Sequence, residues 1–334
     1  MTAPDGVPAL LAGLRRRFDA ALAEQLRGAR AVAVLDFPDH DNVGDTAIWL
    51  GEQQALARLG VRIAYSATHG RHRDDVVDAL PRDVPLLLHG GGNFGDVWPE
   101  NHAFREHVVA RFADRRIVQL PQTVWFADEA AAQRSAAALR RHPDLTVMTR
   151  DDEGTAYVRD VLGLASVLVP DAALAIDPAT LPAPRPAEAP VVVQWRTDHE
   201  SAGRRAAPAG VPVFDWFPPH SRRRQVLSAA DARLRPAVTS AAARRASTAL
   251  HAAIATGGVH RGLAMVQRGE VLVTDRLHGV VLATLSGRRS VWVDNSYGKV
   301  GRLHDTWLSS SPLSRRADSP EEAVATARRL AGGA

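Results

Sequence analysis

Short apolar segments alternate with segments of helical spacing along the first half of the chain. The apolar segments occupy residues 30–37, 61–66, 84–89, 115–120, 145–149 and 165–169. Between them, apolar residues recur at the spacing of an amphipathic helix over residues 46–59, 103–112, 127–140 and 152–162. Strands that alternate with helices in this order form a parallel sheet with helices on both faces. The pattern therefore predicts an α/β protein.

A segment rich in proline and alanine, residues 177–190, interrupts this pattern and is typical of a linker. Strand patterns resume after it at 191–195, 211–216, 270–275 and 288–294, and helical patterns at 300–307 and 320–330. An Arg/Ala-rich stretch, 221–268, is also helical in character, and we expect a break at Gly257–Gly258.

The pattern as a whole predicts two Rossmann-like doubly wound domains that face a cleft. We place an N-terminal domain at 1–178, a linker at 179–190 and a C-terminal domain at 191–334. Ligands of such sheets bind beyond the carboxyl ends of the strands.

Composition narrows the classes of protein. The chain has 334 residues and no cysteine, which excludes disulfides, cysteine-ligated zinc, iron–sulfur clusters and a thiol nucleophile. The formal net charge of +4 suits anionic small molecules. No basic stripe interleaved with aromatic residues is present, so we expect no nucleic-acid partner. No segment resembles a signal peptide or a bilayer span, and we therefore expect a cytoplasmic protein.

The segment from Leu10 to Leu26 is amphipathic and contains three consecutive arginines. A helix packed against the first domain is the favoured interpretation, because ordinary amphipathic helices are far commoner than membrane-bound ones. Peripheral contact with the inner face of a membrane stays open as the alternative.

The segment VTDRLHG, residues 273–279, places polar residues where a strand passes directly into a helix. Arg276 carries a forked donor that matches carboxylate or phosphate. His278 can bind an anion and move a proton near neutral pH. Gly279 would let a ligand approach the backbone, and the free N–H groups of a helix start attract anions. The alternative is structural: Arg276 pairs with a carboxylate such as Asp275, and His278 caps the turn.

The glycine-rich segment GGGNFGD places Gly90, Gly92 and Gly95 at the spacing of a dinucleotide-binding fingerprint. That fingerprint also requires an acidic residue at the end of the next strand, where this chain has Leu-Pro-Gln. NAD binding is therefore disfavoured. A close backbone approach to another ligand is favoured, and a structural tight turn stays open.

The segment DHDNVGD brings Asp39, Asp41 and Asp45 together around His40. Metal binding by these carboxylates is one interpretation. The plainer one is that Asn42 and Gly44 shape a turn and Asp45 caps the next helix, while one acid could act as a base for a sugar hydroxyl. Another polar segment, RDDEG, begins with Arg150 at a strand end and continues into an acidic helix start.

Taken together, the strand-end segments resemble the polysaccharide pyruvyl transferase family. Each segment alone is weakly specific, but their order and spacing extend from residue 31 to about residue 307, and TDRLHG is the most specific. The segments that carry the resemblance are NVGDTAI (42–48), GGGNFGD (90–96), PQT (121–123), TRDDEG (149–154), PDAAL (170–174), TDRLHG (274–279) and DNSYGKVG (294–301). The Arg/Ala-rich stretch matches no motif of the family.

The resemblance implies a fold like that of GT-B glycosyltransferases, with phosphoenolpyruvate as donor. The product would be a pyruvate ketal on two hydroxyls of a sugar in a bacterial exopolysaccharide or cell-wall glycan precursor. The family motif implies that Arg276 and His278 contact phosphoenolpyruvate, with Arg150 as a further contact. Neither a metal nor a cofactor is implied, and phosphoenolpyruvate is a co-substrate.

The chemistry of this donor agrees with the residue types. Phosphoenolpyruvate carries a phosphate and a carboxylate, so its site needs several cations, and ketal formation needs an acid. His278 is the candidate acid, and Asp45 and Asp96 are candidate bases. Further donor contacts are expected from Gly279, Lys299 and Arg302. Candidate acceptor-side and loop residues are Asn42, Gly44, Gly91, Gly92, Asn93 and Gln122.

Two other functions stay open on the sequence alone. A GT-B glycosyltransferase that uses a nucleotide sugar would share the fold and an anion site. A non-catalytic protein that binds anions or saccharides would share both without turnover. The identity of the acceptor, its linkage to a lipid and the formation of a homo-oligomer also stay open.

Overall fold

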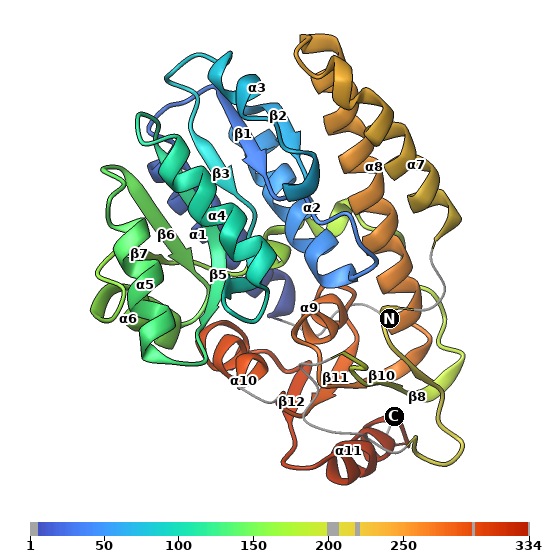
Figure 1. Ribbon diagram of the computed structural model, residues 1–334. Coiled ribbons are helices and arrows are strands. Elements are labelled where there is room, and N and C mark those ends of the chain that lie inside the picture. Colours follow the sequence, from blue (N-terminus) through green and yellow to red (C-terminus); the bar gives the residue numbers. More distant parts are fainter. Residues whose placement is uncertain (1–5, 199–206, 218–220, 296–297, 333–334) are drawn as a thin grey trace.

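The computed structural model describes residues 6–198, 207–217, 221–295 and 298–332. Two sheets form its framework, and every strand pair in them is parallel. Helices flank both sheets (Figure 1). The α/β class expected from the alternating pattern is confirmed.

The first sheet contains the strands of the first half of the chain in the order β2-β1-β3-β5-β6-β7, and β4 pairs with β5. Its strands are β1 (Ala31–Leu35), β2 (Arg62–Ala67), β3 (Leu86–Leu88), β4 (Gly91–Gly95), β5 (Ile117–Trp125), β6 (Leu145–Thr149) and β7 (Ala165–Leu168). Its helices are α1 (Val7–Leu26), α2 (Val43–Arg58), α3 (Asp74–Asp78), α4 (Pro99–Arg111), α5 (Glu129–Leu139) and α6 (Asp152–Asp160). Short 3-10 turns, η2 (Ala172–Ala175) and η3 (Pro178–Thr180), follow β7.

The second sheet has the order β12-β11-β10-β8-β9. Its strands are β8 (Ala189–Gln194), β9 (Val213–Phe214), β10 (Gly269–Thr274), β11 (Arg289–Trp292) and β12 (Ser314–Arg316). Its part of the chain also forms α7 (Arg222–Leu234), α8 (Ala241–Val266), α9 (Leu277–Leu285), α10 (Lys299–Leu303) and α11 (Pro320–Gly332). The short strand β12 was not expected from the sequence. The domain boundaries proposed from the sequence stay a prediction.

The glycine-rich segment is a strand rather than a loop. β4 runs parallel to the second half of β5, with Gly91 opposite Gln122 and Gly95 opposite Trp125. A Cβ atom on Gly95 would lie 1.7 Å from the carbonyl oxygen of Trp125, and φ is +120° at Gly95. Glycine is therefore required there for close strand packing. The PQT segment was expected after a strand. Because β5 continues to Trp125 beside β4, this segment lies in the middle of β5.

The Arg/Ala-rich stretch forms the hairpin of α7 and α8, which stands beside α2 (Figure 1). The expected break at Gly257–Gly258 is wrong, because α8 continues through both glycines and the chain turns before it, at residues 235–240. A Cβ atom on Gly258 would lie 2.5 Å from Thr46 Oγ1 of α2. The glycine is explained by close packing between helices and not by a turn.

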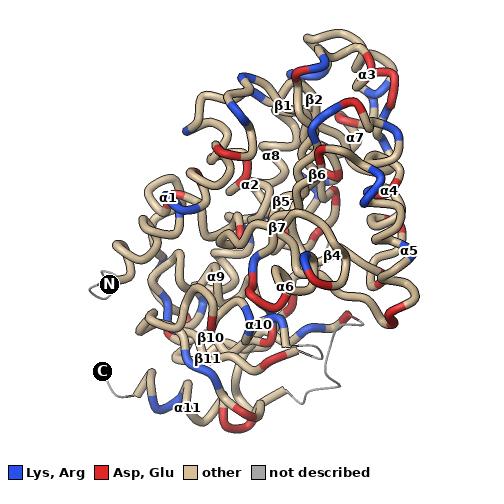
Figure 2. Tube along the Cα trace, turned by 90° about the vertical axis from the view of Figure 1, so that its left-hand side faces the viewer, with Lys and Arg blue, Asp and Glu red and all other residues tan. Residues whose placement is uncertain are grey.

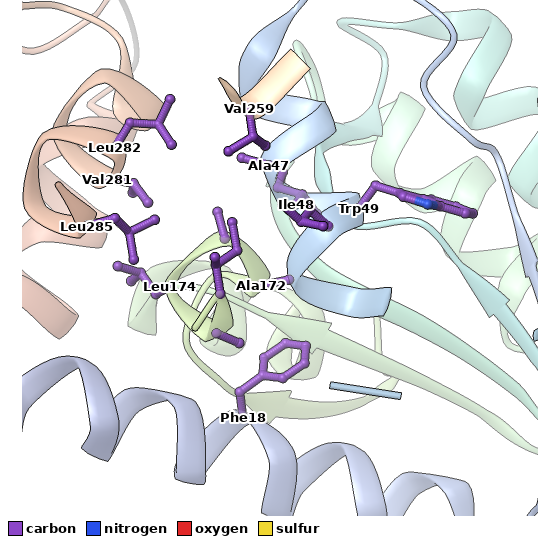
Figure 3. Close-up of a cluster of buried hydrophobic side chains, with 14 of the residues drawn as sticks. Phe18, Ala47, Ile48, Trp49, Ala172, Leu174, Val259, Val281, Leu282 and Leu285 are labelled. Atoms are coloured by element: carbon purple, nitrogen blue, oxygen red, sulfur yellow. The ribbon is translucent and has the colours of Figure 1, made fainter. Parts of the chain in front are cut away.

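One hydrophobic cluster connects the helices of the two sheets (Figure 3). It contains Phe18 of α1, Ile48 of α2, Val259 of α8 and Leu282 of α9, each at most 1% exposed. Such close-packed interiors resist relative motion of their parts, so the cluster holds the ends of the two sheets against each other.

The apolar face of α1 is buried in the same cluster. Of its arginines, Arg15 pairs with Asp177 at 2.9 Å and Arg17 lies over the ring of Trp307. The packed interpretation of this helix is therefore confirmed. Among the described helices, none is long and apolar enough to span a membrane. Figure 2 shows basic and acidic positions interspersed along the chain in that view.

Candidate active site

A cavity of about 630 Å³ lies where the carboxyl ends of both sheets meet. The segments that follow β1, β2, β3, β6, β8, β9 and β10 line it, as expected for ligand sites of parallel sheets. The predicted site residues that line it are Asn42, Asp45, Gly92, Asn93, Arg150, Arg276, His278 and Lys299.

Arg150 and His278 come from different sheets and share one carboxylate, that of Asp171. Arg150 Nη1 donates to Asp171 Oδ2 at 2.6 Å, and His278 Nε2 lies 3.4 Å from the same oxygen. Burial alone would raise the pKa of Asp171, but the charges of His278 and Arg150 outweigh it and hold the pKa well below its usual range. Asp171 thus stays ionised and links the two predicted donor contacts. The sequence placed it in the strand-end segment PDAAL but assigned it no role.

The start of α2 packs directly on His278. Asn42 caps this helix, since its Oδ1 accepts a hydrogen bond from the N–H of Gly44 at 3.0 Å. A Cβ atom on Gly44 would lie 2.4 Å from His278 Nδ1, so only glycine leaves room for the imidazole. The expectation that Asp45 caps the helix is wrong: Asp45 lies in the first turn and accepts from Asn42 Nδ2 at 2.8 Å.

Arg276 is buried and paired with carboxylates, as in the structural alternative, although Asp275 is not one of them. Its Nε and Nη2 donate to the two oxygens of Asp215 at 2.5 and 2.8 Å, and Nη2 also lies 3.0 Å from Asp198 Oδ2. Asp275 instead accepts from the N–H of Arg196. Burial alone would raise the pKa of Asp198, but Arg196 and Arg276 lower it to about 2. The guanidinium of Arg276 is therefore fixed in orientation at the cavity wall.

Six predicted site residues do not line the cavity: Asp96, Arg302, Gly279, Gly44, Gly91 and Gln122. Asp96 accepts from the N–H of Ala127 at 2.8 Å, and Arg302 pairs with Glu153 at 3.2 Å. A Cβ atom on Gly279 would meet Gln194 Oε1 at 2.3 Å, so this glycine serves packing between α9 and the sheet. Its role as a donor contact stays a prediction.

Two predicted loop residues stand behind the lining. Gln122 accepts from the N–H of Asn93 at 3.1 Å and donates to Asn93 Oδ1 at 2.8 Å, which orients that side chain. Gly91 has φ of +134°, and a Cβ atom there would lie 3.5 Å from Asp45 Oδ1.

The acidic segment after β1 is held by arginines. Asp39 pairs with Arg71 and with Arg224 of α7, each at 3.0 Å, and Arg224 also bonds Asp41 at 3.0 Å. Within the described ranges, no group of three His, Cys, Asp or Glu side chains is arranged to hold a metal ion.

Asp36, at the end of β1, lines the cavity and was missed by the sequence analysis. Its carboxylate accepts from Asn101 Nδ2 at 3.0 and 3.1 Å and lies 3.4 Å from both Asn93 Nδ2 and His69 Nδ1. Its φ is +70°, an uncommon value for a residue with a side chain and one that clusters at functional sites. A positive φ at a residue with a side chain cannot be predicted from the sequence pattern.

The chain was compared with known proteins. The family model described as polysaccharide pyruvyl transferase matches residues 42–297. "Pyruvyl transferase 1" of Schizosaccharomyces pombe is 28% identical over 86% of this chain and 72% of its own length. "Putative pyruvyl transferase EpsO" of Bacillus subtilis is 29% identical over 84% of this chain and 86% of its own.

A solved structure supports the fold. The crystal structure of an uncharacterized protein of Klebsiella pneumoniae matches with a TM-score of 0.63 and 17% identity, over 92% of this chain and 99% of that one. The similarity extends through both sheets, consistent with a GT-B-like arrangement of two Rossmann-type halves. With the family match over most of the sequence, the chain belongs to the polysaccharide pyruvyl transferase family and is a pyruvyltransferase.

Proposed function

We propose that this enzyme takes the pyruvyl group from phosphoenolpyruvate and joins it to two hydroxyls of a sugar as a cyclic ketal, releasing phosphate. The observation that carries the proposal is the meeting of Arg150, Arg276, His278 and Lys299 around one cavity. A donor with a phosphate and a carboxylate needs several cations in one place.

The donor would lie against the second sheet. His278 is in the first turn of α9, whose free N–H groups favour an anion. Arg150 and His278, already joined through Asp171, would contact the phosphate, while the fixed fork of Arg276 and the amine of Lys299 complete the set. His278 would then protonate the departing phosphate or the methylene carbon.

The acceptor would lie against the first sheet. Asp36, Asn93 and Asn101 present carboxylate and amide groups that match sugar hydroxyls. Trp98 lines the same region and is 38% exposed, which offers a ring face to a sugar. Asp45 would accept a hydroxyl proton. We propose a glycan precursor of a bacterial exopolysaccharide or cell wall as the acceptor class.

The decisive experiment measures phosphate release from phosphoenolpyruvate with a panel of sugars, both free and lipid-linked. Mass spectrometry should show an acceptor that has gained pyruvate minus water. Consumption of a nucleotide sugar with no release of phosphate from phosphoenolpyruvate would contradict the proposal.

The proposal requires neither a metal nor another cofactor, because arginine side chains supply the charge. Calorimetric binding of phosphoenolpyruvate should be the same with and without a chelator. A strict need for magnesium would contradict this part of the proposal.

A further inference from the structure

His89 follows β3 and lines the cavity on its first-sheet side, with 2% of its surface exposed. Its Nδ1 lies 2.8 Å from Oε2 of Glu52, a residue of α2 that is also 2% exposed. The other carboxylate oxygen of Glu52 accepts from the N–H of Gly90 at 2.9 Å. His89 Nε2 is buried and has no hydrogen-bond partner among the described residues.

The carboxylates around this ring favour its charged form. Burial alone would lower the pKa of His89, but Glu52, with smaller contributions from Asp45 and Asp36, raises it. In the charged form both ring nitrogens carry a proton, and Nε2–H then has no acceptor among the described residues. Buried donors in folded proteins nearly always have a partner, so a ligand in the cavity is the expected partner of this one.

We propose that His89, oriented by its hydrogen bond to Glu52, is a second acid of the reaction. The inference rests on the proposed function. Ketal formation removes one proton from each of two hydroxyls, places one on the methylene carbon and leaves one on phosphate. The reaction therefore has two acid steps, and His278, beside Arg150 and the start of α9, lies on the phosphate side.

His89 would donate the proton that the methylene carbon receives. Its Nε2–H bond breaks as the C–H bond forms at the methylene carbon, and electrons of the enol double bond make that new bond. The proton of the first hydroxyl passes to Asp45 as the hydroxyl oxygen bonds to the central carbon, and from Asp45 it returns to the neutral ring of His89. The second hydroxyl displaces phosphate, and its proton leaves with the phosphate, so the turnover restores both histidines.

The test is His89→Gln with kinetics and calorimetry on the full chain. We expect the dissociation constant of phosphoenolpyruvate to change by less than about threefold and kcat to fall by about 10²–10⁴, the range for loss of a general acid. His142→Gln is the matched control, because His142 is 7% exposed, bonds the carbonyl of Phe112 and does not line the cavity. This control should keep the kcat of the wild type.

Glu52→Gln tests the positioning role of the carboxylate. With Glu52 gone, burial would lower the pKa of His89 even though Asp45 and Asp36 remain, so the alkaline limb of the kcat profile should move to lower pH. If His89→Gln does not fold, the pH profile of Glu52→Gln decides the question. An unshifted limb, or a wild-type kcat in folded His89→Gln, would overturn the inference. A wild-type enzyme that neither binds phosphoenolpyruvate nor releases phosphate would instead overturn the proposed function.

Discussion

The two sides of the cavity differ in the groups that the proposal assigns to acceptor and donor, although Arg71 also lines the first-sheet side and Asp198 the second-sheet side. The side built on the first sheet presents the carboxylates of Asp36 and Asp45 and the amide of Asn93, whereas the side built on the second sheet presents Arg276 and Lys299 with His278. Carboxylates and amides bind hydroxyls, and cations bind phosphate and carboxylate. The difference supports the proposal that donor and acceptor bind on opposite sheets and react between them.

Arg150 shows why both sheets are needed. It follows β6 of the first sheet, yet it joins His278 of the second through Asp171. Gly44 makes the complementary contact, because α2 of the first sheet reaches His278 there. The anion site is therefore a product of the junction and not of either sheet alone.

The largest effect should come from His278→Gln, which removes the proposed acid on the cationic side. We expect kcat to fall by about 10²–10⁴ while the dissociation constant of phosphoenolpyruvate changes little, because an acid acts in the transition state. Steady-state kinetics and calorimetry check this. A raised KM with an unchanged kcat would make His278 a phosphate ligand only.

Asp171→Asn should break the link between the sheets. Removing one partner from a buried ion pair costs about 3–5 kcal/mol, because the remaining charge is left unpaired. The folded pKa of Asp171 lies below its unfolded value, so its contribution is full above about pH 4 and is lost as pH falls further. Urea unfolding should show a variant that is less stable at pH 7, with the deficit shrinking toward pH 2. Equal stability at pH 7 would mean that the pair contributes nothing.

Gly44→Ala should disturb the contact between α2 of the first sheet and His278 of the second. The new Cβ would overlap His278 Nδ1, and a displacement of about 1 Å at a reacting group can lower the rate by about 10²-fold. Gly13→Ala on α1 is the matched control, since nothing lies within 4 Å of its added Cβ. The control should be active and more stable by about 0.5–1 kcal/mol. Full activity of Gly44→Ala would show that His278 can move freely.

Arg276→Lys should weaken the cationic side while keeping its charge. Lysine cannot reproduce the fork on Asp215, and we expect donor binding to lose about 1–3 kcal/mol. Calorimetry measures this, and thermal melting reports any structural cost. An unchanged dissociation constant would make Arg276 a structural arginine, held by Asp215 and Asp198 alone.

Asp96→Asn should have the smallest effect. Asp96 lies outside the cavity lining, so we expect kcat and KM like those of the wild type and a change in stability within about 0.5 kcal/mol. A large loss of kcat would restore Asp96 as a base and move the acceptor site toward β4.

The sequence pattern alone predicts most of the helices and strands, and it places the polar candidate residues at the carboxyl ends of the strands. Apolar periodicity located α4, α5, α6 and most strands, because burial on two faces requires nearly continuous apolar strands. The strand-end positions of Arg150 and His278 followed from the same pattern, since the carboxyl ends of parallel strands share one edge. Apolar periodicity could not show that β4 is a strand, because β4 is rich in glycine. Its Gly95 is required by the close approach of β5 and not by any local pattern.

The sequence pattern does not show which strand-end residues come together in the folded chain. Asp36 and His89 line the cavity, and Asp171 is buried behind it against Arg150 and His278. Asp96 and Arg302 are outside the lining, although all five lie in or next to segments of similar polarity. A sequence pattern shows the face of an element, but the direction of a side chain at its end depends on the elements packed around it. Gly258 of α8 illustrates the reason, because its contact with α2 links positions 212 residues apart, Thr46 and Gly258. Contacts of that kind are set by packing across the whole chain and leave no local mark.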